Sequence, residues 1–226
     1  NIAIALNEQA DPQGAIKWYK RALEIEPNHA ESYINMGVLF GELGDSTAAQ
    51  RYYKKALEIE PNHAEAHLNM ALELLKDQQF NEGFSLYEWR SKTKERAGTQ
   101  LKSSKRRWNG EINQTVFLWS EQGIGDVIMF SSMVSELHAV CSKLIIQCDK
   151  RLIPIFKRSF PKDIAYYSDR ISVTEDEYDF HIPITSLGQH FRKTVEHFSK
   201  TSRGWLVSDH VKTDLLKSKL SDNGRK

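Results

Sequence analysis

Cysteine is nearly absent from this sequence, since only Cys141 and Cys148 occur among 226 residues. There is no CxxC pair to form a redox motif or to complete a zinc site, so neither a disulfide framework nor a structural metal site is indicated. This favours a reducing compartment, and we expect a cytoplasmic protein. Long apolar runs are also absent, and a membrane-spanning helix needs about 20 such residues, so no membrane span is expected.

The overall composition is that of a globular protein with unevenly distributed charge. Hydrophobic residues make up 40% and charged residues 27% of the chain, which argues against wholesale disorder. The net charge of +1 conceals three zones: residues 1–89 carry 7 basic and 14 acidic residues, residues 90–107 carry 8 and 1, and the remainder carries 16 and 15. The length and these zones predict more than one structural region.

The acidic zone repeats itself at an offset of 34 residues. The ten residues Ala22–Glu31 return unchanged as Ala56–Glu65, and Tyr19 returns as Tyr53 and Tyr87. Internal periods of this length are typical of solenoid proteins. Within each period, small and large apolar residues have the spacing of two amphipathic helices.

Turn signals separate these helices. Gly44-Asp45 is expected to end one helix and cap the next, and Pro27 and Pro61 are expected to end each second helix. The period, the small residues and the closing proline resemble the tetratricopeptide repeat. The resemblance implies an α-solenoid of two and a half to three units over residues 1–94, which binds a protein or peptide.

The third unit departs from the pattern. From residue 64 to about residue 94, Asp77–Phe80 replaces the glycine-aspartate turn, and Gly83 replaces an alanine. Terminal repeats have only one neighbour and are commonly atypical, so we expect this unit to act as a cap.

Asn1, Asn35 and Asn69 are spaced by one period each. First helices line the concave face of such solenoids, so the three amides are expected to form a row along a peptide-binding groove. An amide offers one acceptor and two donors and can pair with a peptide unit in both directions. The row resembles the asparagine ladder in the repeat arm of protein O-linked N-acetylglucosamine transferases. Alternatively, these side chains satisfy a neighbouring helix end or face water. Each unit opens five residues before its asparagine, so the chain is expected to be trimmed at its front.

A basic connector follows the repeats. Residues 95–111 are expected to form a linker, and the stretch from 90 to 107 holds no aromatic residue in its interior on which bases could stack. A solvated linker is the favoured interpretation, contact with an anionic ligand is the second, and nucleic acid binding is not expected.

Residues 112–226 show a different pattern, in which strands and helices alternate. Strands are predicted at 115–119, 144–148, 164–167 and 180–184, and helices at 126–139, 151–160, 187–198 and 209–220. Such alternation predicts a doubly wound parallel sheet covered on both faces. The fold class is therefore α plus α/β, with a helical solenoid followed by a Rossmann-like lobe.

In such sheets ligands bind beyond the carboxyl ends of the strands, here at the loop from 120 to 126. Gly123 and Gly125 are expected to allow a tight turn and to expose backbone amides. A third glycine is lacking at Ile128, so NAD or FAD is not expected, and no P-loop lysine occurs. No metal site is expected.

Polar residues of the same loop are the candidate catalytic groups. Asp126 is expected to begin the following helix, either as its cap or as a base that accepts a proton from an incoming hydroxyl. Glu121 and Gln122 are expected to hold an acceptor or the loop itself.

The segments Tyr87–Arg90, Trp108–Gly110 and Glu121–Asp126, with Asp179–Ile184, resemble a known combination. It is that of bacterial tetratricopeptide proteins whose carboxyl-terminal part is similar to glycosyltransferase family 9, the heptosyltransferase relatives with a two-lobed GT-B fold. The resemblance implies that residues 112–226 are the first half of that fold and end at an interlobe linker. It also implies that Asp126 is the general base of an inverting sugar transfer.

In that family the nucleotide-sugar binds mainly to the second lobe, for which the residues after Arg203 leave no room. A donor is therefore expected only in a full-length protein, no cofactor is expected on this chain, and the isolated chain should be inactive. A sugar or a polypeptide could serve as acceptor. The alternative, from another functional class, is a non-catalytic adaptor whose repeats mediate protein-protein interaction.

Overall fold

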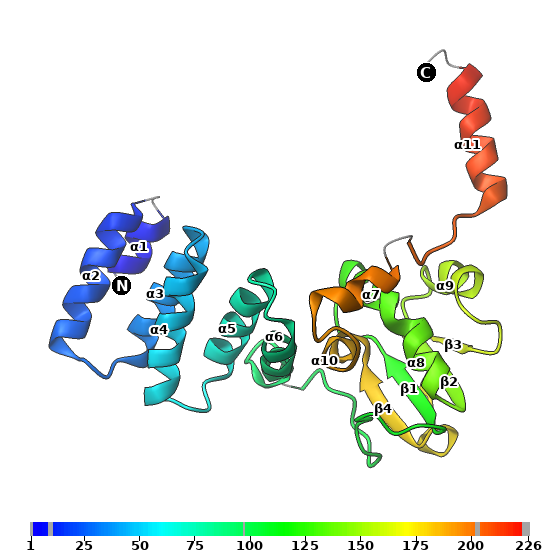
Figure 1. The fold of residues 1–226 in the computed structure, drawn as a ribbon, viewed down its shortest axis with the longest axis horizontal. Helices are drawn as coiled ribbons and strands as arrows, with labels where there is room; N and C mark the ends of the chain where they lie inside the picture. The colour runs from blue at the N-terminus through cyan, green and yellow to red at the C-terminus, as the bar shows by residue number, and fades with distance from the viewer. Residues whose placement is uncertain (1, 9–10, 97, 202–203, 223–226) are drawn as a thin grey trace. The chain divides into compact units, whose positions relative to one another are not determined.

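The structure is a computed structural model that describes residues 2–8, 11–96, 98–201 and 204–222. The chain divides into two compact units, residues 1–100 with 192–195 and residues 101–191 with 196–226. Figure 1 shows helices alone in the first unit and a sheet with helices in the second. No helix among the described residues is both long and apolar enough to cross a membrane.

The first unit is a row of antiparallel helix pairs (Figure 1). Over its described residues it contains α1 (Ile2–Glu8), α2 (Pro12–Ile25), α3 (Ala30–Glu42), α4 (Ser46–Ile59), α5 (Ala64–Lys76) and α6 (Phe80–Tyr87), followed by the 3₁₀ helix η1 (Glu88–Lys92). Consecutive helices pack against one another, as the two-helix period predicts.

The predicted turn signals are confirmed. Gly44 has a φ of +81°, in the left-handed region that glycine occupies without strain. The next residue, Asp45, caps α4 by accepting a hydrogen bond from the Ala48 amide at 2.9 Å. The second helices α2 and α4 end two residues before Pro27 and Pro61.

Two apolar clusters hold the pairs together, and the period places the same residue types in both. Ala15 and Tyr19 lie in the first cluster, and their counterparts Ala49 and Tyr53 lie in the second. These four side chains are at most 5% exposed. Burial of a small and a large apolar residue at each helix crossing therefore explains why both recur at 34 residues.

The second unit contains a parallel sheet of β1 (Thr115–Trp119), β2 (Lys143–Cys148), β3 (Ala165–Ser168) and β4 (Phe180–Pro183). The strand order is β3-β2-β1-β4, so the chain moves outward from β1 through β3 and then returns to the other side of β1. The predicted strands and their parallel pairing are confirmed.

The helices of this unit are α7 (Ile124–Phe130), α8 (Val134–Val140), α9 (Ile153–Ser159), α10 (Gly188–Phe191) and α11 (His210–Asp222). Short 3₁₀ segments occur as η2 (Ser131–Met133), η3 (Glu175–Glu177), η4 (Ile184–Leu187) and η5 (Val195–Thr201). The single helix predicted over 126–139 is thus two helices joined by η2.

One face of the sheet differs from the doubly wound expectation. Phe117 and Trp119 of β1 and Ile145 of β2 form a buried cluster with Tyr178. The residues from outside the sheet that pack there are Leu101, Val173 and Tyr178, and all three lie outside the α-helices. Loop residues therefore contribute to the cover that helices provide in a doubly wound fold.

Part of the segment expected to be a solvated linker packs against this sheet. The Trp108 amide donates to the His181 carbonyl of β4 at 2.9 Å, and the His181 amide donates to the Arg106 carbonyl at 3.2 Å. The Ser104 amide donates to Glu175 at 2.7 Å. Trp108 is 4% exposed, so its side chain belongs to the core of the second unit, whereas Ser104 and Arg106 are exposed.

The first residue of the basic stretch is also structural. Arg90 is 1% exposed and donates to the Tyr87 carbonyl at 3.1 Å and to the Glu88 carboxylate at 2.8 Å. Its guanidinium lies 4.8 Å from the centre of the Tyr87 ring. Arg90 therefore fastens η1 to the end of the repeats rather than serving as solvated charge.

Candidate peptide groove and the loop after the first strand

Four positions on each first helix share one face. They have the spacing i, i+4, i+7 and i+11, which places side chains in a single stripe along an α-helix. On α3 the stripe is Glu31, Asn35, Val38 and Glu42, and on α5 it is Glu65, Asn69, Leu72 and Lys76. Each stripe thus runs from a carboxylate through an amide and an apolar residue to a charged residue.

A hollow of about 580 Å³ lies between the two stripes. Val38 and Glu42 of α3 line it together with Asn69, Leu72 and Lys76 of α5. Asn69 therefore lies in a groove between first helices, and Asn35 is one turn before Val38 on the stripe that forms the other wall. The remaining member of the expected row, Asn1, lies outside the described residues.

The amides of Asn35 and Asn69 are not used within the fold. Both residues are partly buried, and neither side chain forms a hydrogen bond with a described residue. Among the described residues, these two amides therefore do not form hydrogen bonds with the backbone at the end of a neighbouring helix, which was the alternative. Their role in a groove stays a prediction.

A buried carboxylate forms the floor of the hollow. Glu73 is 5% exposed, accepts a hydrogen bond from Ser46 at 2.6 Å and forms an ion pair with Lys76 at 2.6 Å. A Cβ at Gly41 would lie 2.7 Å from this carboxylate, so glycine leaves room for it. Burial, and then the nearby carboxylates of Glu73 and Glu42, raise the pKa of the Tyr53 hydroxyl beneath it.

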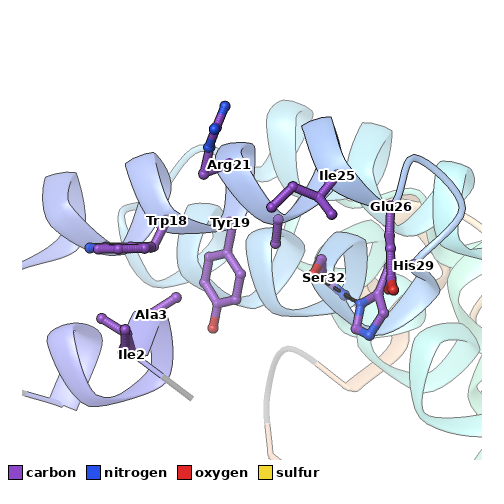
Figure 2. A pocket seen from close by; sticks show the side chains of 10 residues that line it. Ile2, Ala3, Trp18, Tyr19, Arg21, Ile25, Glu26, His29 and Ser32 are labelled. Atoms are coloured by element: carbon purple, nitrogen blue, oxygen red, sulfur yellow. Dashed lines mark hydrogen bonds between the residues drawn. The ribbon is translucent and has the colours of Figure 1, made fainter.

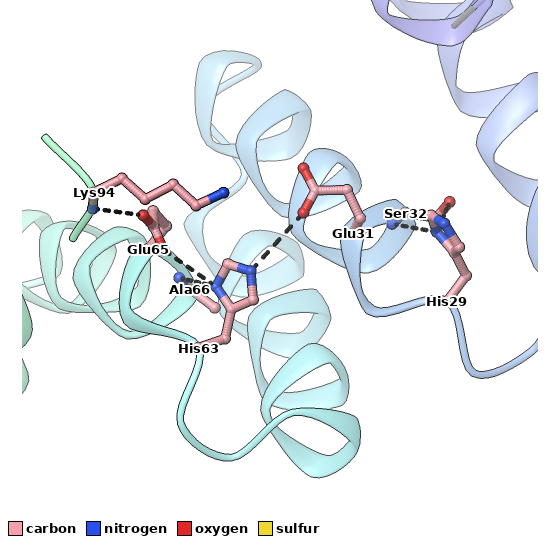
Figure 3. Close-up of polar contacts among 7 residues, drawn as sticks. All are labelled: His29, Glu31, Ser32, His63, Glu65, Ala66 and Lys94. Carbon is pink, nitrogen blue, oxygen red and sulfur yellow. Dashed lines mark hydrogen bonds and ion pairs between the residues drawn. The ribbon is translucent and has the colours of Figure 1, made fainter. Parts of the chain in front are cut away.

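Histidines cap the first helices, as Figure 3 shows. Nδ1 of His29 accepts from the Ser32 amide at 3.1 Å, and Nδ1 of His63 accepts from the Ala66 amide at 3.2 Å. Nε2 of His63 also lies 3.9 Å from Glu31, which links the start of α5 to the stripe on α3. The repeated histidines His29 and His63 thus have a structural role as helix caps.

Glu65 begins the stripe on α5, as Glu31 begins the stripe on α3, and its carboxylate already accepts a hydrogen bond within the fold. It accepts a hydrogen bond from the Lys94 amide at 3.1 Å, and this bond holds the pKa of Glu65 below its usual value. The side chain of its counterpart Glu31 is 58% exposed and lies 3.9 Å from Nε2 of His63. Of these two carboxylates, Glu65 is therefore held by a hydrogen bond and Glu31 is exposed.

Another hollow, of about 380 Å³, lies at the amino-terminal end of the array. In Figure 2, Trp18 and Tyr19 extend from α2 towards Ile2 and Ala3 of α1. Trp18 is 46% exposed, whereas its counterpart Tyr52 stacks on Phe40 at 5.2 Å. We assign no ligand to this hollow.

In the second unit, the loops after β1 and β4 meet where the strand order reverses. A parallel sheet presents its ligand-binding crevice at such a reversal, beyond the carboxyl ends of the strands. Glu121, just after β1, accepts a hydrogen bond from the hydroxyl of Thr185, just after β4. Thr185 is 1% exposed, so Glu121 holds the two loops together.

Asp126 occupies a different helix position from the one expected. The helix α7 begins at Ile124 with Gly123 as its N-cap residue, and no side chain caps it. Asp126 is therefore not the cap of this helix, which was one of the two alternatives, and its role as a base stays a prediction. It lies in the first turn, where the helix dipole stabilises a carboxylate, and it forms no hydrogen bond with a described residue.

The two loop glycines are not required by backbone strain. Gly123 has a φ of −65°, and Gly125 is likewise not among the residues with positive φ. A Cβ at Gly125 would meet no atom within 4 Å. The loop therefore does not contain the tight turn that was expected to require Gly123 and Gly125. Gln122 lies in the same loop and is partly buried.

Sequence reasoning missed Thr185 as a partner of Glu121, although its place directly after a predicted strand could have indicated it. It also missed the contact beside the loop, where the Trp119 indole donates to Nδ1 of His181 at 3.2 Å. Burial, and then the charge of Arg107, lower the pKa of His181. Within the described residues, no group of three or more histidine, cysteine, aspartate or glutamate side chains could hold a metal ion.

Comparison with known proteins identifies the repeats. Two family models described as tetratricopeptide repeat match residues 1–62 and 52–83. Residues 1–83 therefore carry tetratricopeptide repeats, which confirms the resemblance drawn from the period.

Individual relatives match larger or smaller parts of the chain. Protein FlbA of Caulobacter vibrioides is 23% identical over 234 residues, which covers 95% of this chain and 39% of that protein. The chain thus spans about two-fifths of the length of this curated relative.

Two solved structures with similar folds each match less than half of the chain. MamA 41-end from Desulfovibrio magneticus RS-1 is 27% identical with a TM-score of 0.39, covering 41% of this chain and 52% of that one. The first tetratricopeptide domain of Spaghetti (RPAP3), bound to the HSP90 peptide SRMEEVD, is 14% identical with a TM-score of 0.40, covering 42% and 78%. None of these matches supports sugar transfer.

Proposed function

We propose that this chain is a protein-interaction module whose groove between α3 and α5 binds an extended segment of a partner protein. The observation that carries the proposal is the pair of unused amides, Asn35 and Asn69, at equivalent positions on neighbouring first helices. Repeats of this family form the groove, and the adaptor alternative fits the comparisons better than the transferase.

The groove has the chemistry to hold a peptide backbone. Each asparagine amide can donate to a peptide carbonyl and accept from a peptide amide, so a row of them recognises main chain rather than sequence. Val38 and Leu72 lie one turn further along the two stripes, and Leu72 is 43% exposed. They offer an apolar contact to a side chain of the bound segment.

A peptide display library selected on the immobilised protein would supply a ligand for the test. The best peptide is then synthesised, labelled and titrated by fluorescence anisotropy. Changing Asn35→Ala together with Asn69→Ala should weaken its binding by about a hundredfold, because two sets of hydrogen bonds in a partly buried groove are lost. The melting temperature should change by only a few degrees.

Two other asparagines provide a matched control. Asn28 and Asn62 are also one period apart but lie exposed in the turns after α2 and α4. The double change Asn28→Ala and Asn62→Ala should leave peptide affinity unchanged. If selection yields no peptide above background, or if the groove variant binds as tightly as the wild type, the proposal fails.

A second proposal concerns the sheet, for which the meeting of Glu121 and Thr185 at the strand-order reversal is the supporting observation. We propose that it is a Rossmann-like lobe that contributes acceptor contacts and the base Asp126 to a sugar transferase. This proposal has less support, because the family matches end at residue 83. In a protein that contains the lobe and transfers sugar, Asp126→Asn should lower turnover by about a hundredfold or more. Unchanged turnover would remove the base role.

A further inference from the structure

The second helices of the repeats carry a basic surface that the groove does not use. The surface consists of three rows, each formed by residues one period apart on α2 and α4. The rows are Lys17 with Arg51, Lys20 with Lys54, and Arg21 with Lys55. Six of the seven basic residues within residues 1–89 therefore lie in these rows.

These six side chains share the outward side of their helices. Their spacing of i, i+3 and i+4 places them on one face, opposite the buried Ala15 and Tyr19 of α2 and the buried Ala49 and Tyr53 of α4. All six residues are exposed. The basic residues of this surface thus recur at the same 34-residue offset as the buried residues of the core.

Few of these charges are neutralised. Arg21 pairs with Glu24 at 2.6 Å, and no other member of the rows forms an ion pair with a described residue. Arg51 and Lys55 lie over the rings of Tyr52 and Tyr33 at 5.3 and 5.6 Å. Lys17, Lys20 and Lys54 remain without a partner among the described residues.

The order of the charges does not serve helix stability. A helix is stabilised by acidic residues near its start and basic residues near its end, and a glutamate stabilises best when it precedes its lysine by four residues. On α2 the basic residues precede Glu24, and on α4 they precede Glu58, so both helices have the reverse order. Apart from the Arg21–Glu24 pair, helix stability therefore gives little reason for these rows.

We propose that this basic surface binds an acidic segment of a polypeptide, separately from the groove. Carboxylates spaced along an extended or helical segment would meet cations in successive repeats at the pitch of the array. A hollow of about 660 Å³ beside Lys17, Lys20 and Arg21 is also lined by Ile16 and Trp18, which offers apolar contact next to the charges.

Charge favours an acidic polypeptide over nucleic acid or an anionic membrane. Residues 1–89 as a whole carry twice as many acidic as basic residues, so they repel a long polyanion. A short segment on the basic surface is affected mainly by charges within the Debye length of about 8 Å. Four of the six cations are also lysines, which bind single carboxylates, whereas bidentate phosphate recognition favours arginine.

The test uses a labelled peptide of alternating glutamate and serine, with a lysine and serine peptide for comparison, on the whole chain. The glutamate peptide should bind, and its affinity should fall when salt rises from about 50 to about 200 mM. Changing Lys17→Gln, Lys20→Gln and Lys54→Gln together should weaken binding about tenfold. The matched control changes Lys150→Gln, Lys157→Gln and Lys162→Gln, three exposed lysines of the second unit, and should bind as the wild type does.

Circular dichroism and melting temperature verify that the variants fold. The proposal is overturned if the glutamate peptide does not bind, or if both triple variants lose affinity equally. It is also overturned if duplex DNA or phosphatidylserine vesicles bind more tightly than the peptide and lose that binding in the Lys17, Lys20 and Lys54 variant. Because the groove residues are unchanged in every variant, failure here leaves the groove proposal standing.

Discussion

The α3–α4 unit and the α5–α6 unit have different residues at several positions that the period makes equivalent. Gly37 corresponds to Ala71, and Gly44 corresponds to Gln78. Both turns nevertheless form the same two hydrogen bonds, from residue 44 to 41 and from 45 to 40 in one unit, and from 78 to 75 and from 79 to 74 in the other. The period therefore fixes the backbone, while the side chains around it vary.

Some of the differences compensate one another. Gly41 and Ala49 of one unit become Leu75 and Gly83 of the next. A Cβ at Gly83 would lie 2.9 Å from Leu75, so the larger residue fits only because the other has lost its methyl group. Gly83 therefore replaces the alanine of the repeat pattern because Leu75 is larger than the glycine at the equivalent position. The two departures from the pattern are thus coupled.

The largest effect is expected from giving the α3–α4 unit the alanine of its neighbour. In Gly37→Ala the new Cβ would lie 2.5 Å from the ring of buried Tyr53, so ring or helix must shift. After the gain in helix propensity is subtracted, we expect a loss of about 2 kcal/mol in the free energy of unfolding. Urea denaturation measures it.

A double-mutant cycle tests the cause of that loss. In a Tyr53→Leu background the ring is absent, and Gly37→Ala should cost much less than it does alone. Equal cost in both backgrounds would show that the ring is not responsible.

The exchange between Leu75 and Gly83 should produce the next largest effect. Gly83→Ala places a methyl against Leu75 and 3.2 Å from its backbone nitrogen, and should reduce stability by about 1.5 kcal/mol. Adding Leu75→Ala makes room, so the double variant should be more stable than the sum of the single changes predicts. Additive effects, read from denaturation midpoints, would contradict the compensation.

The fold was largely predictable where local chemistry decides it. Asp45 and Pro61 mark helix ends through backbone hydrogen bonding, and the apolar run 115–119 forms a strand in the centre of the sheet. The break between α7 and α8 and the packing of Trp108 on β4 were not predicted. Trp108 and His181 are far apart in sequence, and a pattern of nearby residues holds no information on such pairing.

The candidate sites differ in the same way. The 34-residue offset was enough to place Asn35 and Asn69 on equivalent helices, because a helix face is a local property. The loop after β1 is held by Glu121 and Thr185, which are 64 positions apart and come together only through the sheet. Periodicity therefore predicts a repeated surface well and a site assembled from separate strands poorly.

A smaller effect is expected at the turns of the two units, where exchanging Gly44 and Gln78 should change stability in opposite directions. Gln78 has a φ of +60°, in the left-handed region that strains a side-chain-bearing residue, whereas Gly44 occupies that region freely. Gln78→Gly should therefore raise the free energy of unfolding by up to about 1 kcal/mol, and Gly44→Gln should lower it by about as much. Thermal denaturation of both variants checks the opposite signs, and a change of the same sign in both would disprove the equivalence of the turns.

The smallest effect is expected at Glu65, whose carboxylate accepts the Lys94 amide while that of its counterpart Glu31 does not. This bond lowers the pKa of Glu65 in the folded state below the usual 4.5, so it stabilises the fold above that pH and the contribution is lost on acidification. The side chain is 39% exposed and screened by solvent, so Glu65→Gln should reduce stability by only about 0.3 kcal/mol at pH 7. The difference from wild type should shrink as the pH falls through the lowered pKa. A difference that stays constant down to acid pH would mean that the Lys94 bond does not distinguish the two units.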